Sequence, residues 1–256
     1  MMTRDIFLLR VDKLRQSLSS QGLDGIFITN LTSVRYISGF TGSAGSCLIT
    51  EDESYFISDG RYDIQSKKQV GNMIRFIDFG NHISIIAKNN LLKDGLNLAF
   101  EGDHTSYSQF KSISESFPKI NWESTSMLME NLQAVKDESE LNAIRAAVEI
   151  TDVIYEEILP MLRPGTTEKE VANQLVLRYR QESDGEAYNP IVAGGENGAL
   201  PHAVGRFGRG GAPPMIKYFA GNPLQMISKT VSGAGPAGCA CARPAFHRRR
   251  AHAPGT

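Results

Sequence analysis

The first part of the chain alternates two hydrophobic patterns, one with the spacing of a helix and one with that of a strand. Apolar residues at helical spacing predict helices, and short apolar runs bounded by Gly, Asp or Pro predict strands. The predicted helices are 5–21, 33–38, 61–69, 82–93 and 105–117. The predicted strands are 25–29, 46–50, 54–58, 73–79, 96–101 and 120–124.

This alternation favours an α/β sheet domain with helices on its faces. Strands 46–50 and 54–58 are separated only by the turn-like Glu51-Asp52-Glu53, which is typical of a hairpin. A hairpin joins antiparallel strands, so the sheet is predicted to be mixed rather than purely parallel.

A longer helical pattern begins near Val135. Apolar positions from Leu141 to Leu159 form one face of a long amphipathic helix. A second helix is predicted to run from Thr167 to about Glu182, because Thr167 and Glu170 have the spacing of a capping box. This change of pattern predicts a second domain.

The patterns divide the chain into three predicted parts, which are 1–134, 135–203 and 204–256. The last part is rich in Gly and Pro, and only 215–219 and 224–228 are apolar enough to form ordered elements. It buries too little apolar surface to offset its ordering entropy, so we expect a low-order tail.

Charge separates the parts as clearly as hydrophobicity does. The net charge is −1, yet the last acidic residue is Glu196 and eight Lys and Arg residues follow it. Such asymmetry is typical of a nucleic-acid-binding tail or of two parts with separate origins. The basic cluster at 247–252 has no aromatic residue between its charges and no fold around it, so we expect no specific nucleic-acid partner.

Cysteine usage and hydropathy indicate a cytoplasmic protein. The three cysteines are too few and too unevenly spaced for a disulfide framework. Residues 1–16 carry charges within their apolar pattern, unlike a signal peptide, and no stretch reaches the ~18 apolar residues of a membrane span. We therefore expect no membrane association.

Two local motifs have weak chemical signals. The glycine-rich segment 38–50 lacks the Lys-Ser/Thr of a phosphate-binding loop and the glycine spacing of a dinucleotide site, so it is interpreted as a tight loop that enters a strand. Cys239 and Cys241 are one residue apart, which does not match the usual Cys-x₂₋₄-Cys spacing of zinc ligands.

Two residues remain as candidates for chemistry. Arg61 follows a predicted strand, where its guanidinium could hold a carboxylate; the alternative is a solvated or structural salt bridge with Asp59. His202 follows a strand and a glycine-rich turn, where an imidazole could act as acid, base or carbonyl polariser. Spacing alone favours the alternative of a packed or surface histidine.

Five segments in order resemble the family of aminopeptidase P and the Xaa-Pro dipeptidases, over about residues 6–203. They are GFTGSAG, DGRY, DESELNAIRAAVEITD, LRPGTTEKEVA and IVAGGENGALPHA. The resemblance implies a creatinase-type N-terminal domain, a mixed-sheet α/β/α layer, followed by the start of a pita-bread α+β domain.

The resemblance also implies a chemistry. Full-length members hydrolyse the peptide bond that precedes proline with two divalent metals, usually manganese or cobalt, which activate a shared water and stabilise the oxyanion. His202 would be catalytic without binding metal, and Arg61 would bind substrate. The implied partners are proline-containing peptides and a second copy of the chain, bound through the N-terminal domain.

The chain departs from the family where the metal ligands belong. Those ligands are two Asp, one His and two Glu, and all follow the histidine that corresponds to His202. No Asp or Glu follows Glu196, and the family's Gly-Asp and Ser-Asp-x-Thr-Arg stretches are absent. We therefore expect no metal cofactor in this chain and no peptidase activity from it.

A reading-frame shift near codon 203 is the leading hypothesis for this departure. The part before it is rich in Ile, Lys and Asn, and the part after it is rich in Gly, Ala, Pro and Arg, whose codons are GC-heavy. The alternatives are a genuine short protein with a basic tail, a metal-free creatinase-like hydrolase, and a non-enzymatic dimerisation or regulatory module built from 1–134.

Overall fold

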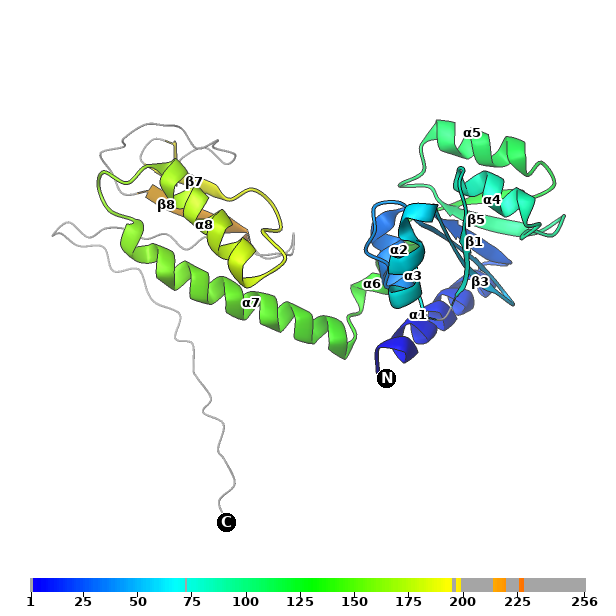
Figure 1. Cartoon of the computed structure of the whole chain (residues 1–256), viewed down its shortest axis with the longest axis horizontal. Helices are drawn as coiled ribbons and strands as arrows, with labels where there is room; N and C mark the ends of the chain where they lie inside the picture. Colours follow the sequence, from blue (N-terminus) through cyan, green and yellow to red (C-terminus); the bar gives the residue numbers. More distant parts are fainter. Residues whose placement is uncertain (1, 72, 195–196, 199–213, 220–225, 228–256) are drawn as a thin grey trace, which may run out of the picture. The chain divides into compact units, whose positions relative to one another are not determined.

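The computed structural model describes residues 2–71, 73–194, 197–198, 214–219 and 226–227. The chain folds into two compact units, and the boundary between them lies between Asp137 and Glu138 in the sequence (Figure 1). The domain limits inferred from the sequence, at 134 and 203, stay predictions.

Unit 1 consists of a six-stranded sheet and the helices around it. Its strands are β1 (Gly25–Ile28), β2 (Ser46–Thr50), β3 (Ser54–Ser58), β4 (Ile74–Ile77), β5 (Asn97–Glu101) and β6 (Asn121–Thr125). Its helices are α1 (Met2–Ser19), α2 (Leu31–Ser38), the 3₁₀ turn η1 (Gly60–Tyr62), α3 (Asp63–Gln69), α4 (His82–Lys88), α5 (Tyr107–Ser116) and α6 (Leu128–Ala134).

The sheet is mixed, which confirms the prediction from the sequence. The strand order is β4-β3-β2-β1-β5-β6. The pairs β1–β2 and β2–β3 are antiparallel, and the pairs β3–β4, β1–β5 and β5–β6 are parallel. The hairpin predicted from the short turn is present as β2–β3, in which Ser46 pairs with Ile57. Consequently every strand except β2 ends at the same edge of the sheet, which we call the carboxyl edge.

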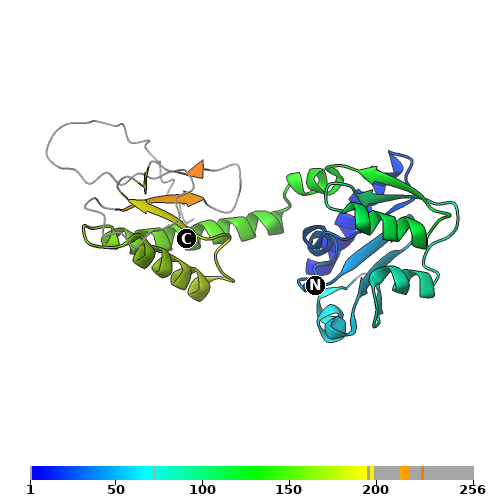
Figure 2. The ribbon, with the colours of Figure 1, turned by 90° about the horizontal axis from the view of Figure 1, so that it is seen from above.

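Helices cover both faces of this sheet, as Figure 2 shows from above. Alternate residues of β1 point to opposite faces. Ile26 and Ile28 belong to one buried cluster together with residues of α1, α2 and α6. Phe27 belongs to a second cluster together with residues of α4 and α5. Unit 1 is therefore a three-layer α/β/α domain.

Local sequence signals determine where the early helices begin and end. After α1, Gly22 adopts φ +71°, a left-handed conformation that favours glycine. Asn30 caps α2 by accepting a hydrogen bond from the Thr32 N–H at 3.1 Å. Gly39 ends the same helix with φ 76° and donates its N–H to the Arg35 carbonyl.

Two elements of unit 1 differ from the sequence prediction. Helix α6 was not predicted, although its Leu128 and Met129 are buried. Helix α4 ends at Lys88 rather than at residue 93. The apolar residues Leu91 and Leu92, which extended the helical pattern, instead pack from a loop against the second cluster.

Unit 2 begins with a helical hairpin. Its described elements include α7 (Glu138–Ile158), the 3₁₀ turn η2 (Leu159–Met161), α8 (Glu168–Glu182) and β7 (Ile191–Gly194). A small core joins α7, α8 and β7 through Ile154, Val171, Leu175 and Val192. The capping box predicted at Thr167 is present, because its hydroxyl and the Glu170 carboxylate bond each other's backbone N–H groups.

Two short strands follow the core of unit 2. Strand β8 (Pro214–Phe219) pairs antiparallel with β7 and with β9 (Met226–Ile227). They lie in the two segments of the tail that the sequence singled out as able to form ordered elements. The rest of the predicted low-order tail lies outside the described residues. No described helix has the length and apolarity that crossing a membrane requires.

Candidate functional site

Arg61 lies at the carboxyl edge, just after β3, and forms a salt bridge with Asp59. Its Nε and Nη2 donate to the two carboxylate oxygens of Asp59 at 2.9 and 2.8 Å. The Arg61 side chain is 72 % exposed and that of Asp59 is 21 % exposed. The pair lowers the pKa of Asp59, chiefly through this side-chain hydrogen bond, and raises that of Arg61.

This geometry has a consequence for the predicted substrate-binding role of Arg61. One edge of its guanidinium already holds a carboxylate in bidentate fashion. A substrate carboxylate would have to displace Asp59 or use the other edge. The role of Arg61 stays a prediction.

The glycine-rich loop 39–45 packs against the turn that carries Arg61. The Ser43 and Tyr62 hydroxyl groups are 2.7 Å apart, and hydrogen bonding with Ser43 lowers the pKa of Tyr62. The rings of Phe40 and Tyr62 meet edge to face at 5.3 Å. A Cβ atom at Gly42 would lie 2.7 Å from the Tyr62 ring, so this close approach requires glycine. The GFTGSAG and DGRY segments thus pack directly against each other.

Glu101 joins the ends of two neighbouring strands beneath this edge. It is the last residue of β5 and is 4 % exposed. Its Oε2 accepts hydrogen bonds from the backbone N–H groups of Thr29 and Asn30, both at 3.0 Å. Sequence reasoning missed this role; the available signal was a carboxylate that ends the apolar strand LNLAFE.

Glu168 has a similar role in unit 2. It is buried at the start of α8, and its Oε1 accepts from the Gly194 N–H at 2.7 Å and from Asn197 Nδ2 at 3.0 Å. The carboxylate therefore holds the end of β7, from which the glycine-rich sequence leads toward His202. Sequence reasoning assigned the capping box at this helix start but not the buried acid beside it. His202 itself lies outside the described residues.

The described donors of unit 2 do not fit a pair of metal ions. No three His, Cys, Asp or Glu side chains of the described residues converge on a common point. Two of its acids form ion pairs with arginines of α8: Glu157 of α7 with Arg178 at 2.6 Å, and Glu186, in the loop after α8, with Arg180 at 2.8 Å. Cys239 and Cys241, rejected above as zinc ligands, lie outside the described residues.

Comparison with protein families agrees with this two-unit architecture. Residues 10–135 match the creatinase/prolidase N-terminal domain, and residues 142–217 match metallopeptidase family M24. The chain is thus similar to the creatinase/prolidase N-terminal domain over most of unit 1 and to the M24 metallopeptidases over part of unit 2. The family resemblance inferred from the sequence is thereby confirmed. The M24 match continues to residue 217, past the residue 203 at which the sequence motifs end.

Individual proteins similar to this chain are peptidases. It is 33 % identical over 198 residues to the uncharacterized peptidase YqhT of Bacillus subtilis, covering 77 % of this chain and 56 % of that protein. It is 24 % identical over 198 residues to the Xaa-Pro dipeptidase of Pyrococcus furiosus, covering 76 % of this chain and 55 % of that protein. The chain thus spans little more than half the length of these relatives.

Solved structures give the same picture. The Xaa-Pro dipeptidase from Bacillus anthracis is similar with a TM-score of 0.75 and 32 % identity, covering 82 % of this chain and 60 % of that one. The X-Pro aminopeptidase from Thermotoga maritima MSB8 gives a TM-score of 0.69 and 31 % identity, covering 79 % of this chain and 60 % of that one. The mixed-sheet N-terminal domain is the fold shared with these structures.

Proposed function

We propose that this chain is related to metal-dependent Xaa-Pro peptidases but that a polypeptide of this sequence does not hydrolyse the bond before proline. One observation carries the proposal. The sequence matches family M24 as far as residue 217, yet it contains no Asp or Glu after Glu196.

The chemical reason lies in the ligands that hard divalent ions require. Manganese and similar ions bind carboxylate oxygens in preference to imidazole alone. Without such oxygens, His247 and His252 do not replace the carboxylates of a dinuclear centre. His202 would be left as a hydrogen-bonding group with no activated water beside it.

The test combines metal analysis with a peptidase assay on the purified 256-residue chain. The Xaa-Pro dipeptidase from Bacillus anthracis serves as the positive control, and both proteins are incubated with manganese or cobalt before dialysis. We expect no stoichiometric metal in this chain and no release of proline from Xaa-Pro dipeptides. Stoichiometric manganese or sustained turnover would refute the proposal.

A module that acts through unit 1 is the second candidate. It is supported by the two buried clusters of unit 1, which cover both faces of the sheet with residues of that unit alone. In this proposal the chain is cytoplasmic and forms a homo-oligomer, or a mixed oligomer with a longer relative that binds proline-containing peptides.

Light scattering after gel filtration tests the module. A dimeric mass, and co-elution with a longer relative, would support it, whereas a strict monomer would exclude it.

Adding creatine to the assay without metal tests the third alternative, a creatinase-like hydrolase.

A further inference from the structure

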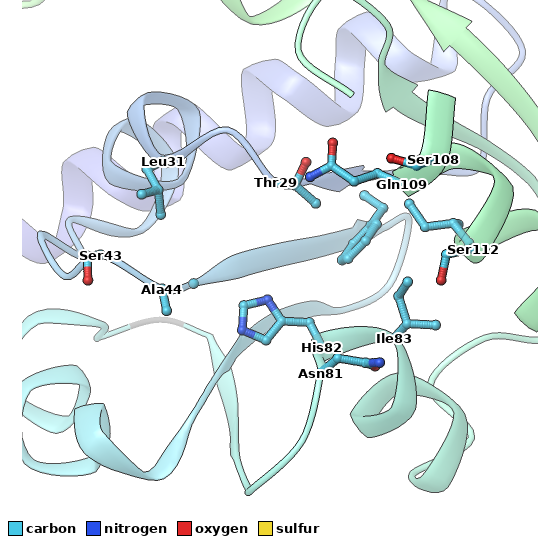
Figure 3. Close-up of a pocket in the computed structure, with 13 residues that line it drawn as sticks. Thr29, Leu31, Ser43, Ala44, Asn81, His82, Ile83, Ser108, Gln109 and Ser112 are labelled. Carbon is cyan, nitrogen blue, oxygen red and sulfur yellow. The ribbon is translucent and has the colours of Figure 1, made fainter. Parts of the chain in front are cut away.

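A cavity of about 520 Å³ opens at the carboxyl edge of the sheet in unit 1 (Figure 3). Its walls come from the end of β1, the loop 43–45 before β2, the start of α4 and the first two turns of α5. Cavities of roughly 300–1,000 Å³ are typical of small-molecule sites.

The topology explains why a cavity forms there. The parallel neighbours β1 and β5 continue into helices on opposite faces, since α2 packs in one cluster and α5 in the other. A crevice opens where the connections of adjacent parallel strands diverge in this way, and such crevices are where open α/β sheets bind ligands.

The lining of the cavity is uncharged and partly apolar. Phe27, Ile83 and Ile113 provide apolar surface, and no Asp, Glu, Lys or Arg among the described residues lines the cavity. A charged ligand would lose its hydration there without gaining an opposite charge, which is costly. The lining therefore favours an uncharged ligand with an apolar part.

His82 provides the most specific polar group. It is the first residue of α4, and its ring projects into the cavity (Figure 3). Burial lowers its pKa, partly offset by the charge of Asp59, so the ring is neutral near pH 7. Neither ring nitrogen forms a hydrogen bond with a described residue. A neutral imidazole therefore offers one donor and one acceptor to the cavity.

Gln109 provides a second group, from α5. Its Oε1 accepts the Ser106 N–H at 2.8 Å as part of the capping box of that helix. This bond leaves the two N–H donors of its amide without an acceptor among the described residues. In Figure 3 this amide projects from the α5 side of the cavity, and the His82 ring projects from the α4 side.

We propose that this cavity binds an uncharged amide of amino-acid size with an apolar side chain, such as a blocked amino acid or an internal residue of a peptide. The ligand carbonyl accepts a hydrogen bond from Gln109 Nε2, and the His82 ring bonds the amide at the other end. The apolar side chain packs against Phe27, Ile83 and Ile113. This proposal does not rest on peptidase activity.

The test is a titration of the full chain with N-acetyl-L-leucinamide, followed by NMR of ¹⁵N-labelled histidine. We expect the His82 ring signals to shift and saturate. His104 is the matched control, because it belongs to the same unit but bonds Glu130 at 2.8 Å and does not line the cavity. Free L-leucine, which carries both charges, should bind at least about tenfold more weakly.

Two variants assign the binding to the named groups, with the backbone amide signals of Thr29 and Ser112 as the readout. His82→Leu should weaken binding by about threefold to tenfold, the loss expected for one hydrogen bond. Gln109→Glu keeps an acceptor for the capping box but replaces the donors with a charge, so it should weaken binding at least as much and decides the matter if His82→Leu fails to fold. His104→Leu should leave the affinity unchanged.

The proposal is overturned by any of three results. One is the absence of a saturable His82 shift up to about 50 mM ligand, a range that covers affinities of millimolar order. Another is equal binding of free L-leucine. The third is unchanged affinity in Gln109→Glu.

Discussion

Burial decides the chemistry of Cys47, the free cysteine among the described residues. The residue is the second of β2, and its side chain is fully buried in the cluster shared with α1 and α2. Burial in apolar surroundings raises the pKa of its thiol to about 12. Because the thiolate is the reactive form, this cysteine should behave as a small apolar residue.

Alkylation tests this prediction. At about pH 8 a free thiol is partly ionised, whereas Cys47 remains protonated until the pH approaches 12. We therefore expect no iodoacetamide adduct at Cys47 in the native protein and rapid modification after unfolding in guanidinium chloride, with peptide mass spectrometry as the readout. Labelling of the native protein at the rate of an unfolded control would contradict the prediction.

At the scale of elements, a single carboxylate joins three parts of unit 1. Glu101 ends β5 and accepts two backbone N–H groups from the segment that links β1 to α2. Those donors stand just before the first turn of α2, so the same bonds position the helix start. A hydrogen bond to a charged group stabilises a protein by about 1.5–3 kcal/mol.

Substitution of this residue should therefore be costly. Glu101→Ala leaves two N–H donors without their acceptor and should lower the free energy of unfolding by about 2–4 kcal/mol. Glu123→Ala is the matched control, because Glu123 is exposed on the adjacent strand β6 and should change stability by less than about 0.5 kcal/mol. Denaturant unfolding measures both, and equal midpoints for the two variants would exclude this role of Glu101.

Only part of the apolar face of the long helix α7 is buried. Its sequence predicted one continuous apolar face from Leu141 to Leu159. In unit 2 the later residues Ile154 and Ile158 are buried against α8, whereas the earlier Ile144 and Val148 are 46 % exposed. Periodicity shows which face is apolar, but only the packing shows how much of that face is covered.

The change in composition along the molecule also leads to a testable prediction. If a frame shift separates the two compositions, one of the other reading frames encodes an Asp-containing strand followed by Ser-Asp-x-Thr-Arg. The M24 match continues to residue 217, so the shift could lie on either side of that residue. The search for these features therefore covers all codons from 203 onward. Retranslation of the encoding DNA is the measurement. The absence of both features from the other two frames would contradict the hypothesis.

Across the whole molecule, the sequence predicted most elements of unit 1 and both long helices of unit 2 because their signals are local. The strand runs, the β2–β3 turn, the glycine after α1 and the capping box of α8 involve residues a few positions apart. Helix α6 and the early end of α4 escaped prediction because both depend on contacts with distant parts of the chain. Leu91 and Leu92 follow α4 and pack against the core from a loop. Hydrophobic periodicity alone therefore predicted a helix that was too long.

The candidate sites follow the same division. By itself, the sequence determined the mixed α/β class of unit 1, the family motifs and the lack of carboxylates after Glu196, since each depends on residue identity and short spacing. Only the tertiary structure decided that Glu101 and Glu168 anchor strand ends and that His82 faces a cavity. These arrangements bring together side chains from separate strands and helices, whose meeting depends on how the sheet and its helices pack.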